Sequence, residues 1–181
     1  MTYAFTYDQV VKMFERNVLP ETLRVELLDG ALVEMTPQGP LHGSEADHIA
    51  ALMRSLYPHL LVREDKPLQI HNVTVPEPDI YLVRGMPADY IKAIPTGMDA
   101  VLVIELSVTT LKRDREKAAY YARGAVPVYW VVDIPKRVLE VYTEPNTLSK
   151  RYITSAKYRQ DEHVDLPELD RKLLVRDLFL V

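Results

Sequence analysis

Two acidic residues interrupt apolar runs that are otherwise typical of buried β-strands. Asp79 lies in VPEPDIYLV, residues 75–83, and Glu105 lies in VLVIELS, residues 101–107. Burying an unpaired carboxylate costs free energy, so such a group usually becomes neutral or binds a cation. Two carboxylates on neighbouring strands would also repel each other unless positive charge lay between them. Both acids are therefore candidate functional residues.

A hard divalent cation between the two acids is one arrangement that removes this repulsion. Mg²⁺ prefers oxygen ligands in near-octahedral geometry and is typically held by one or two carboxylates together with water. In the alternative arrangement, each acid lies at the end of a strand, where it faces water or pairs with an arginine. Short acidic motifs often occur by chance, and the spacing alone leaves both arrangements open.

The N-terminal part of the chain predicts a short helix and a β-hairpin. Apolar residues recur on one face of residues 7–17, as in an amphipathic helix. The stretch RVELLDGALVEMT contains two extended runs around Asp29-Gly30. An Asp-Gly pair between such runs predicts a hairpin, because both turn positions favour positive φ.

A second helix and two short strands are predicted to follow the hairpin. Apolar residues recur at helical spacing over residues 49–56, and Ser44 is the predicted N-cap of this helix. The helix should end near Pro58. The next two segments, residues 60–65 and 68–75, are short and strand-like.

The C-terminal half predicts buried strands around a third helix. Residues 100–107 and 126–133 are apolar nearly throughout, which is typical of strands covered on both faces. Residues 114–123 favour a helix, and Gly124 is placed to end it as a C′ glycine. The tail adds one or two short strands. This order of elements predicts an α/β fold with a mixed β-sheet, a helix on each face and an N-terminal hairpin.

Length and composition limit the classes of protein to consider. The 181 residues, 48% hydrophobic and 27% charged, fit a single globular domain over residues 1–181. The absence of cysteine excludes disulfides, zinc thiolate sites and thiol nucleophiles. No apolar run could span a bilayer and the first residues lack the pattern of a secretory signal, so we expect a cytoplasmic protein. With a net charge of −4, nucleic-acid binding would require a local basic patch.

The segment that begins at Glu105 carries a resemblance to a known family. In ELSVTTLKRDREKAAYYARGAVPVYWVVD, residues 105–133, a Ser/Thr-rich turn and a basic helix start follow the strand acid. Together with VELLDGALVEMTPQGPLHG, EPDIYLV and LEVYT, this segment resembles the putative restriction endonuclease family of the PD-(D/E)xK nuclease superfamily, whose members include small stand-alone bacterial proteins. The matching stretches lie between residues 24 and 143.

The resemblance implies a restriction-endonuclease-like fold, with the active site where a central mixed sheet splays open. Pro78-Asp79 corresponds to the "PD" element and Glu105 to the acid of the "(D/E)xK" element. Ser107 stands where the superfamily pattern has lysine. The resemblance implies that the lysine has moved to the following helix, where Lys117 occupies the matching position. Spacing also puts Lys117 on the same helical face as Tyr121, which we otherwise interpret as a core residue.

Two further residues match family positions. Glu26, at the start of ELLDG, is expected to be a third metal ligand or a partner for Lys117; alternatively it is an edge-strand acid that faces water. His42, in PLHG, is expected to contact a phosphate or the waters of the site, although a histidine at a helix entry is more often a local hydrogen-bonding residue.

The activity implied by the resemblance is that of a Mg²⁺-dependent or Mn²⁺-dependent DNA endonuclease. Asp79, Glu105 and the Leu106 carbonyl would hold the metal, and Lys117 would orient water or stabilise developing charge. The alternative is a catalytically silent protein of nuclease fold that serves as a binding or assembly module. A homodimer is one form that either could take.

Substrate binding would depend on local positive charge. Lys112, Arg113, Arg115 and Arg123 cluster in sequence around the proposed site, where they could contact a DNA backbone. Acids are interleaved with them, so a solvated surface of mixed charge is the alternative.

Overall fold

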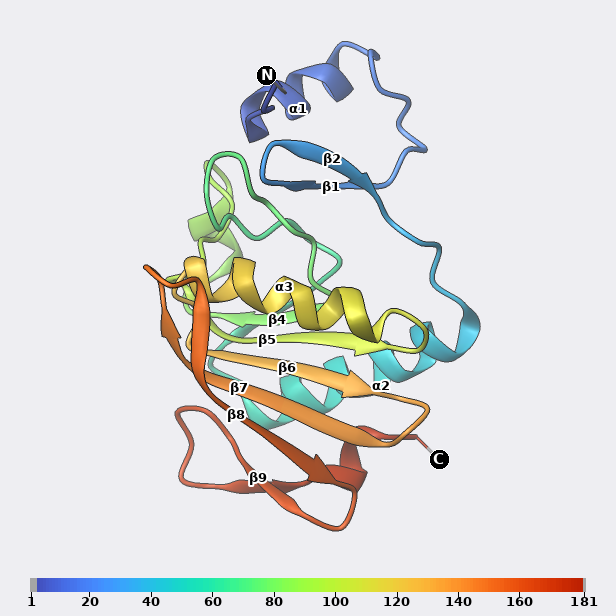
Figure 1. Cartoon of the computed structure of the whole chain (residues 1–181), viewed down its shortest axis with the longest axis vertical. Helices are drawn as coiled ribbons and strands as arrows, with labels where there is room; N and C mark the ends of the chain where they lie inside the picture. Colours follow the sequence, from blue (N-terminus) through green and yellow to red (C-terminus); the bar gives the residue numbers. More distant parts are fainter. Residues whose placement is uncertain (1–2, 181) are drawn as a thin grey trace.

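A six-stranded mixed sheet forms the centre of the structure, a computed structural model that describes residues 3–180 (Figure 1). Its strand order is β3-β4-β5-β6-β7-β8. β5 and β6 are parallel, and every other neighbouring pair is antiparallel. The strands of this sheet are β3 (Leu61–Glu64), β4 (Ile80–Val83), β5 (Ala100–Ser107), β6 (Val128–Asp133), β7 (Val138–Asn146) and β8 (Arg151–Arg159).

Two long helices cover opposite faces of this sheet, which confirms the predicted α/β class (Figure 1). Ile49 of α2 packs in one apolar cluster with Ile104, whereas Tyr121 of α3 packs in another with Val103. No helix in residues 3–180 has the length and apolar character that crossing a lipid bilayer would require. The helices are α1 (Tyr7–Glu15), α2 (Pro40–Leu56) and α3 (Leu111–Arg123), with short 3₁₀ turns η1 (Pro87–Tyr90) and η2 (Val175–Leu178).

The predicted hairpin is confirmed as β1 (Val25–Leu28) and β2 (Ala31–Glu34). Asp29 and Gly30 form its turn with φ of 47° and 81°, the positive values that this pair favours. The hairpin lies with α1 beside the main sheet rather than within it (Figure 1). It therefore brings residues from the start of the chain close to α3.

Three local predictions were wrong. α2 begins at Pro40, with Gly39 as N-cap, and Ser44 lies inside the helix. Proline suits the first helical position because its φ is already helical and its missing N–H had no helical partner there. Residues 68–75 form only isolated bridges, because the segment turns back on itself between His71 and Thr74.

The third wrong prediction concerns the end of α3. Gly124 is the C-cap with φ of −80°, and the left-handed residue is Ala125 at 58°. Glycine at this position serves packing instead, because a Cβ at residue 124 would lie 2.7 Å from the Ile70 side chain. The C-terminal part also contains more strand than expected, since β8 has nine residues and is followed by β9 (His163–Asp165) and β10 (Lys172–Leu174).

A buried carboxylate fastens α3 to the sheet away from the candidate site. Glu140 of β7 accepts hydrogen bonds from Arg115 Nε at 2.8 Å and Tyr142 Oη at 2.9 Å. Lys157 Nζ lies 2.9 Å from Glu140 Oε1. The hydrogen bonds from Arg115 are the main cause that lowers the pKa of Glu140 to about 2.

We predict that Glu140→Gln lowers the free energy of unfolding by about 1–3 kcal/mol at pH 7. Because folding lowers the pKa of Glu140, this stabilisation is complete above the ordinary value of 4.5 and is lost as the pH falls toward 2. Urea unfolding between pH 7 and pH 3 should show the parent and the variant converging. Glu116→Gln is the control, since Glu116 is 64% exposed; a constant difference for Glu140→Gln across this range would contradict the prediction.

Candidate functional site

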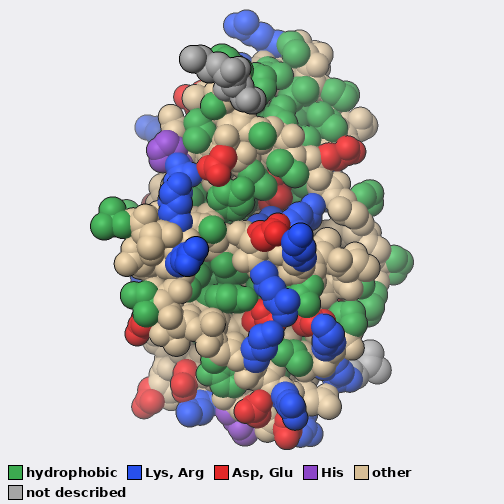
Figure 2. Space-filling view, in the orientation of Figure 1, with side chains coloured by type: hydrophobic (Ala, Val, Ile, Leu, Met, Phe, Trp, Pro, Cys, Tyr) green, Lys and Arg blue, Asp and Glu red, His purple; other side chains and the backbone are tan. Residues whose placement is uncertain are grey.

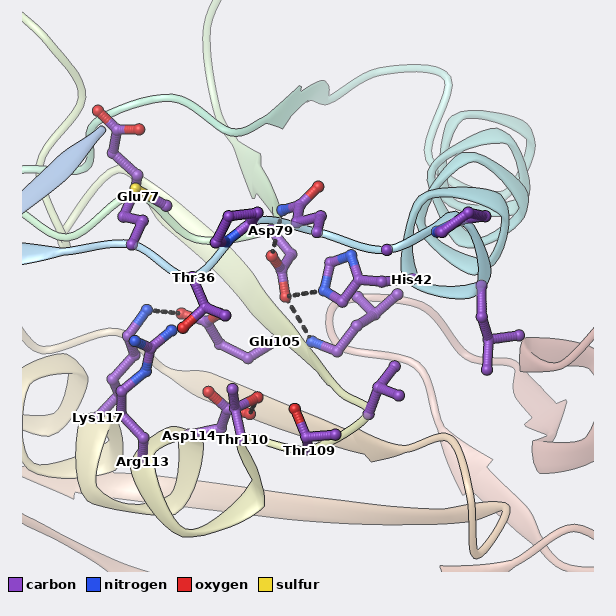
Figure 3. A pocket seen from close by; sticks show the side chains of 18 residues that line it. Thr36, His42, Glu77, Asp79, Glu105, Thr109, Thr110, Arg113, Asp114 and Lys117 are labelled. Atoms are coloured by element: carbon purple, nitrogen blue, oxygen red, sulfur yellow. Dashed lines mark hydrogen bonds and ion pairs between the residues drawn. The ribbon is translucent and has the colours of Figure 1, made fainter. Parts of the chain in front are cut away.

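A cavity of about 300 Å³ opens where the β2–α2 linker, the facing ends of β4 and β5, and the start of α3 meet. The linker, residues 35–39, and the first residues of α2 form one wall (Figure 3). Asp79 and Glu105 lie along the strand ends, and Asp114 and Lys117 face them from α3. Segments far apart in the sequence therefore contribute charged groups to one space.

The two strand acids lie side by side because of the register between β4 and β5. These strands are antiparallel, with Ile80 opposite Ile104. One position further along, Asp79 comes opposite Glu105, and both side chains line the cavity. The structure thus places the two acids on the same face of adjacent strands.

Asp79 is held by groups on three sides. Its Oδ2 accepts a hydrogen bond from the Leu106 N–H at 2.7 Å and lies 3.3 Å from His42 Nε2. Gln38 Nε2 donates to Oδ1 at 3.2 Å. The hydrogen bond with Asp79 is the largest cause of the raised pKa of His42. His42 therefore contacts one of the two acids, and the linker reaches the site through Gln38 as well.

Glu105 is 3% exposed, and its contacts converge on one oxygen. Oε1 accepts hydrogen bonds from Tyr121 Oη at 2.6 Å and Lys117 Nζ at 3.0 Å. Burial raises the pKa of Glu105 well above its usual range; Lys117 opposes this shift, and Asp79 and Glu26 add to it. Glu105 thus lies in a buried, negatively charged environment that would favour a further cation.

Lys117 is a buried cation between two acids. Its Nζ lies 2.7 Å from Glu26 Oε1 and 3.0 Å from Glu105 Oε1, and its side chain is 4% exposed. Burial disfavours the charged form, but Glu105 and Glu26 outweigh it and raise the pKa of Lys117. The side chain is therefore an ammonium group at neutral pH and has no lone pair with which to act as a base.

Glu26 is 1% exposed, so it is not an acid facing water. Its Oε1 accepts from Lys117 and also from the Glu77 N–H at 3.0 Å. Its Oε2 is buried and finds no hydrogen-bond partner among residues 3–180. Of the two roles expected for Glu26, the geometry matches that of a partner for Lys117.

The basic residues around the site have different surroundings. Of the four basic residues expected to contact DNA, only Arg113 lines the cavity, and its Nε is buried with no partner in the described part of the chain. Arg115 pairs with Glu140, Arg123 Nη1 lies 2.7 Å from Asp29 Oδ1, and the Lys112 side chain is 92% exposed.

Sequence reasoning missed several groups that shape the cavity. Gln38 carried no signal, because an amide in a Pro/Gly-rich linker matches no motif. The Thr110 hydroxyl donates to Asp114 Oδ2 at 2.6 Å, and burial raises the pKa of Asp114. Tyr121 was assigned to the core, and its hydroxyl contact with Glu105 depends on how α3 packs on the sheet.

The carboxylates of Asp79 and Glu105 would fit a divalent metal that has few protein ligands and completes its coordination with water. No residue between 3 and 180 donates a hydrogen bond to Glu105 Oε2, and this atom keeps accessible surface toward the cavity. Residues 3–180 contain no group of three or more His, Cys, Asp or Glu side chains placed to hold a metal ion. Two carboxylates and water are nevertheless a usual ligand set for Mg²⁺.

Comparisons with known proteins identify the family and the fold of the chain. The family model described as "Putative restriction endonuclease" (Uma2) matches residues 11–174. The fold is similar to the crystal structure of a putative nuclease belonging to DUF820 from Anabaena variabilis, with a TM-score of 0.75 and 16% sequence identity over 96% of this chain and 97% of that chain. At this identity the likeness establishes the fold alone. A search of curated proteins found no match.

We predict that Lys117→Met lowers the free energy of unfolding by about 3–5 kcal/mol at pH 7, because it leaves two buried carboxylates without their cation. Adding Glu26→Gln should recover part of the loss, so that the double variant is about 1–3 kcal/mol more stable than the sum of the single changes predicts. Urea unfolding of the parent, the two single variants and the double variant measures this coupling free energy.

The exposed pair Arg54–Glu64 provides the matched control. The same cycle with Arg54→Met and Glu64→Gln should give a coupling of about 0–1 kcal/mol. Equal couplings in the two cycles would show that the buried pair has no special role in the fold.

Proposed function

The chain belongs to the Uma2 family of putative restriction endonucleases, and from this premise we propose that it is a metal-dependent endonuclease that hydrolyses phosphodiester bonds in DNA. One observation carries the proposal: Asp79 and Glu105 line a single cavity together with the buried ammonium group of Lys117. Hydrolysis of a phosphodiester requires an activated water and relief of negative charge on the phosphoryl oxygens, and these groups suit both needs.

Asp79 and Glu105 would hold a Mg²⁺ or Mn²⁺ ion, with the Leu106 carbonyl as a further ligand. Bound there, such an ion supplies a water of lowered pKa and a positive charge beside the phosphate. Asp79 keeps its orientation through the Leu106 N–H and His42. The excess of buried carboxyl groups over cations is the reason to expect a metal at this position.

Lys117 provides a fixed positive charge for the reaction. In the hydrolysis, the oxygen of water bonds to phosphorus and one P–O ester bond breaks, giving a phosphate monoester and a hydroxyl group. Negative charge builds up on the non-bridging oxygens during this step. Two of the three N–H groups of Lys117 are directed at Glu26 and Glu105, which leaves the third for a phosphate oxygen.

Arg113 and His42 would contact the substrate or its waters. The guanidinium of Arg113 lies in the cavity wall, and its planar donors suit the oxygens of a phosphate. His42 lines the same cavity and contacts Asp79 through Nε2, which places its ring beside the waters that a bound metal would carry. Glu26 acts through Lys117 by holding its ammonium in place.

The proposed DNA substrate fits the charge on the face that α3 covers. Figure 2 shows Lys and Arg side chains gathered across the middle of this face, with acidic side chains between them. Positive charge of this kind can follow a phosphate backbone without reading base sequence. The homodimer and the cytoplasmic location stay predictions.

A catalytically silent binding or assembly module is the second candidate. The observation that favours it is the absence, in residues 3–180, of a group of three or more metal-ligating side chains. Metal binding and cleavage distinguish the two candidates. Incubation with supercoiled, linear, single-stranded and branched DNA in Mg²⁺ or Mn²⁺ should yield cleavage products if the proposed function is right.

We predict that Asp79→Asn and Glu105→Gln each weaken Mg²⁺ or Mn²⁺ binding beyond detection while the fold survives. Asp79→Asn removes one of two repelling acids, and Glu105→Gln leaves Lys117 paired with Glu26, so we expect both metal-free variants still to fold. Isothermal titration calorimetry measures binding, and circular dichroism checks the fold. Glu64→Gln, on β3 outside the cavity, is the control. Parent-like affinity in either site variant would place the metal elsewhere.

We predict that Lys117→Met lowers the cleavage rate by about 10²–10³-fold, the scale of losing one group that stabilises transition-state charge. Metal binding should be largely kept, because an ammonium is not a ligand. Lys112→Met should instead weaken DNA binding and reduce its salt dependence. Cleavage assays and salt titrations, run where both variants are folded, check this; full activity in Lys117→Met would remove Lys117 from the mechanism.

A further inference from the structure

The hydroxyl of Tyr121 makes a specific polar contact in the core beside the candidate site. It donates to Glu105 Oε1 at 2.6 Å, and the residue is fully buried. The hydroxyl is the donor and the carboxylate oxygen the acceptor in this contact, which joins α3 to the acid of β5. Packing alone would be satisfied by phenylalanine, which has the same ring.

Other tyrosines hold this hydroxyl in place. The ring centroid of Tyr129 lies 4.8 Å from that of Tyr121 and 6.4 Å from that of Tyr152. The hydroxyls of Tyr129 and Tyr152 donate to backbone carbonyls, those of Asp114 and Val126. Within this group of three rings, Tyr121 alone donates to a carboxylate of the candidate site.

The two carboxylate oxygens of Glu105 have different surroundings: Oε1 accepts two hydrogen bonds, and Oε2 faces the cavity. Tyr121 and Lys117 both donate to Oε1, from positions one helical turn apart on α3. Oε2 receives no hydrogen bond from the described residues and is open to the cavity. A carboxylate fixed at one oxygen by two donors cannot rotate freely, so the other oxygen keeps one direction.

We propose that Tyr121 is a positioning residue, whose hydroxyl holds Glu105 so that Oε2 is presented to a divalent cation in the cavity. This inference rests on the proposed function, because it assigns Glu105 as a metal ligand. Groups that orient a metal ligand through a hydrogen bond commonly change metal affinity or activity by about 10–100-fold when they are removed. Tyr121 therefore acts on the metal through Glu105 and does not touch the metal or the substrate.

The test uses Tyr121→Phe, with Tyr152→Phe as the matched control. Each change removes one hydrogen-bonded hydroxyl from the same group of tyrosines, fully buried in Tyr121 and partly buried in Tyr152, but only Tyr121→Phe removes a hydrogen bond to Glu105. Binding of Mn²⁺ to the full chain is measured from the electron paramagnetic resonance signal of the free ion. Circular dichroism and urea unfolding establish that both variants are folded under the conditions used.

We expect the dissociation constant for Mn²⁺ to rise about 10-fold or more in Tyr121→Phe and to stay within about twofold of the parent in Tyr152→Phe. Cleavage by Tyr121→Phe should need more Mn²⁺ for half-maximal rate, while the KM for DNA is unchanged. This pattern would not follow from a loss of stability alone.

Other outcomes have distinct meanings. Parent-like Mn²⁺ affinity in Tyr121→Phe overturns the positioning role and leaves the proposed function intact. Equal weakening in both variants also overturns it, because the effect would then come from the tyrosine packing. If the parent itself binds no Mn²⁺, the proposed function fails first and the inference falls with it.

Discussion

The ion pair of Lys117 with Glu26 and Glu105 is the interaction on which the site depends. Three side chains that are each 4% exposed or less meet there, and each carboxylate would be costly to bury without the ammonium. The ammonium in turn remains charged because two carboxylates outweigh its desolvation. The charge of Lys117 in this position therefore depends on its two acidic partners.

This mutual dependence explains why elements from distant parts of the chain must come together. Glu26 comes from the β1–β2 hairpin, Glu105 from β5 and Lys117 from α3. The hairpin lies outside the main sheet, yet it supplies half of the negative charge that keeps Lys117 protonated. The β1–β2 hairpin therefore contributes, through Glu26, to the charge balance around Lys117 in the cavity.

The same charge arrangement connects the fold to the proposed chemistry. Pairing with Lys117 compensates only part of the negative charge, since Asp79 and Asp114 also line the cavity. Hydrogen bonds from Leu106 and Tyr121 orient the carboxylates without neutralising them. The cavity therefore combines a fixed positive charge with oriented acids, the combination that the proposed hydrolysis of a phosphodiester would use.

The sequence alone determined the α/β class, the hairpin at Asp29-Gly30 and the apolar strands around Glu105, because turn geometry and hydrophobic periodicity are local properties. It also suggested Asp79, Glu105 and Lys117 through their resemblance to a family. Only the tertiary structure decided the contact of Glu26 with Lys117 and the contacts of Gln38 and Tyr121. The partners of these side chains lie at least 16 residues away in sequence. Their contacts depend on how the hairpin, the linker and α3 pack against the sheet, and no local pattern encodes that packing.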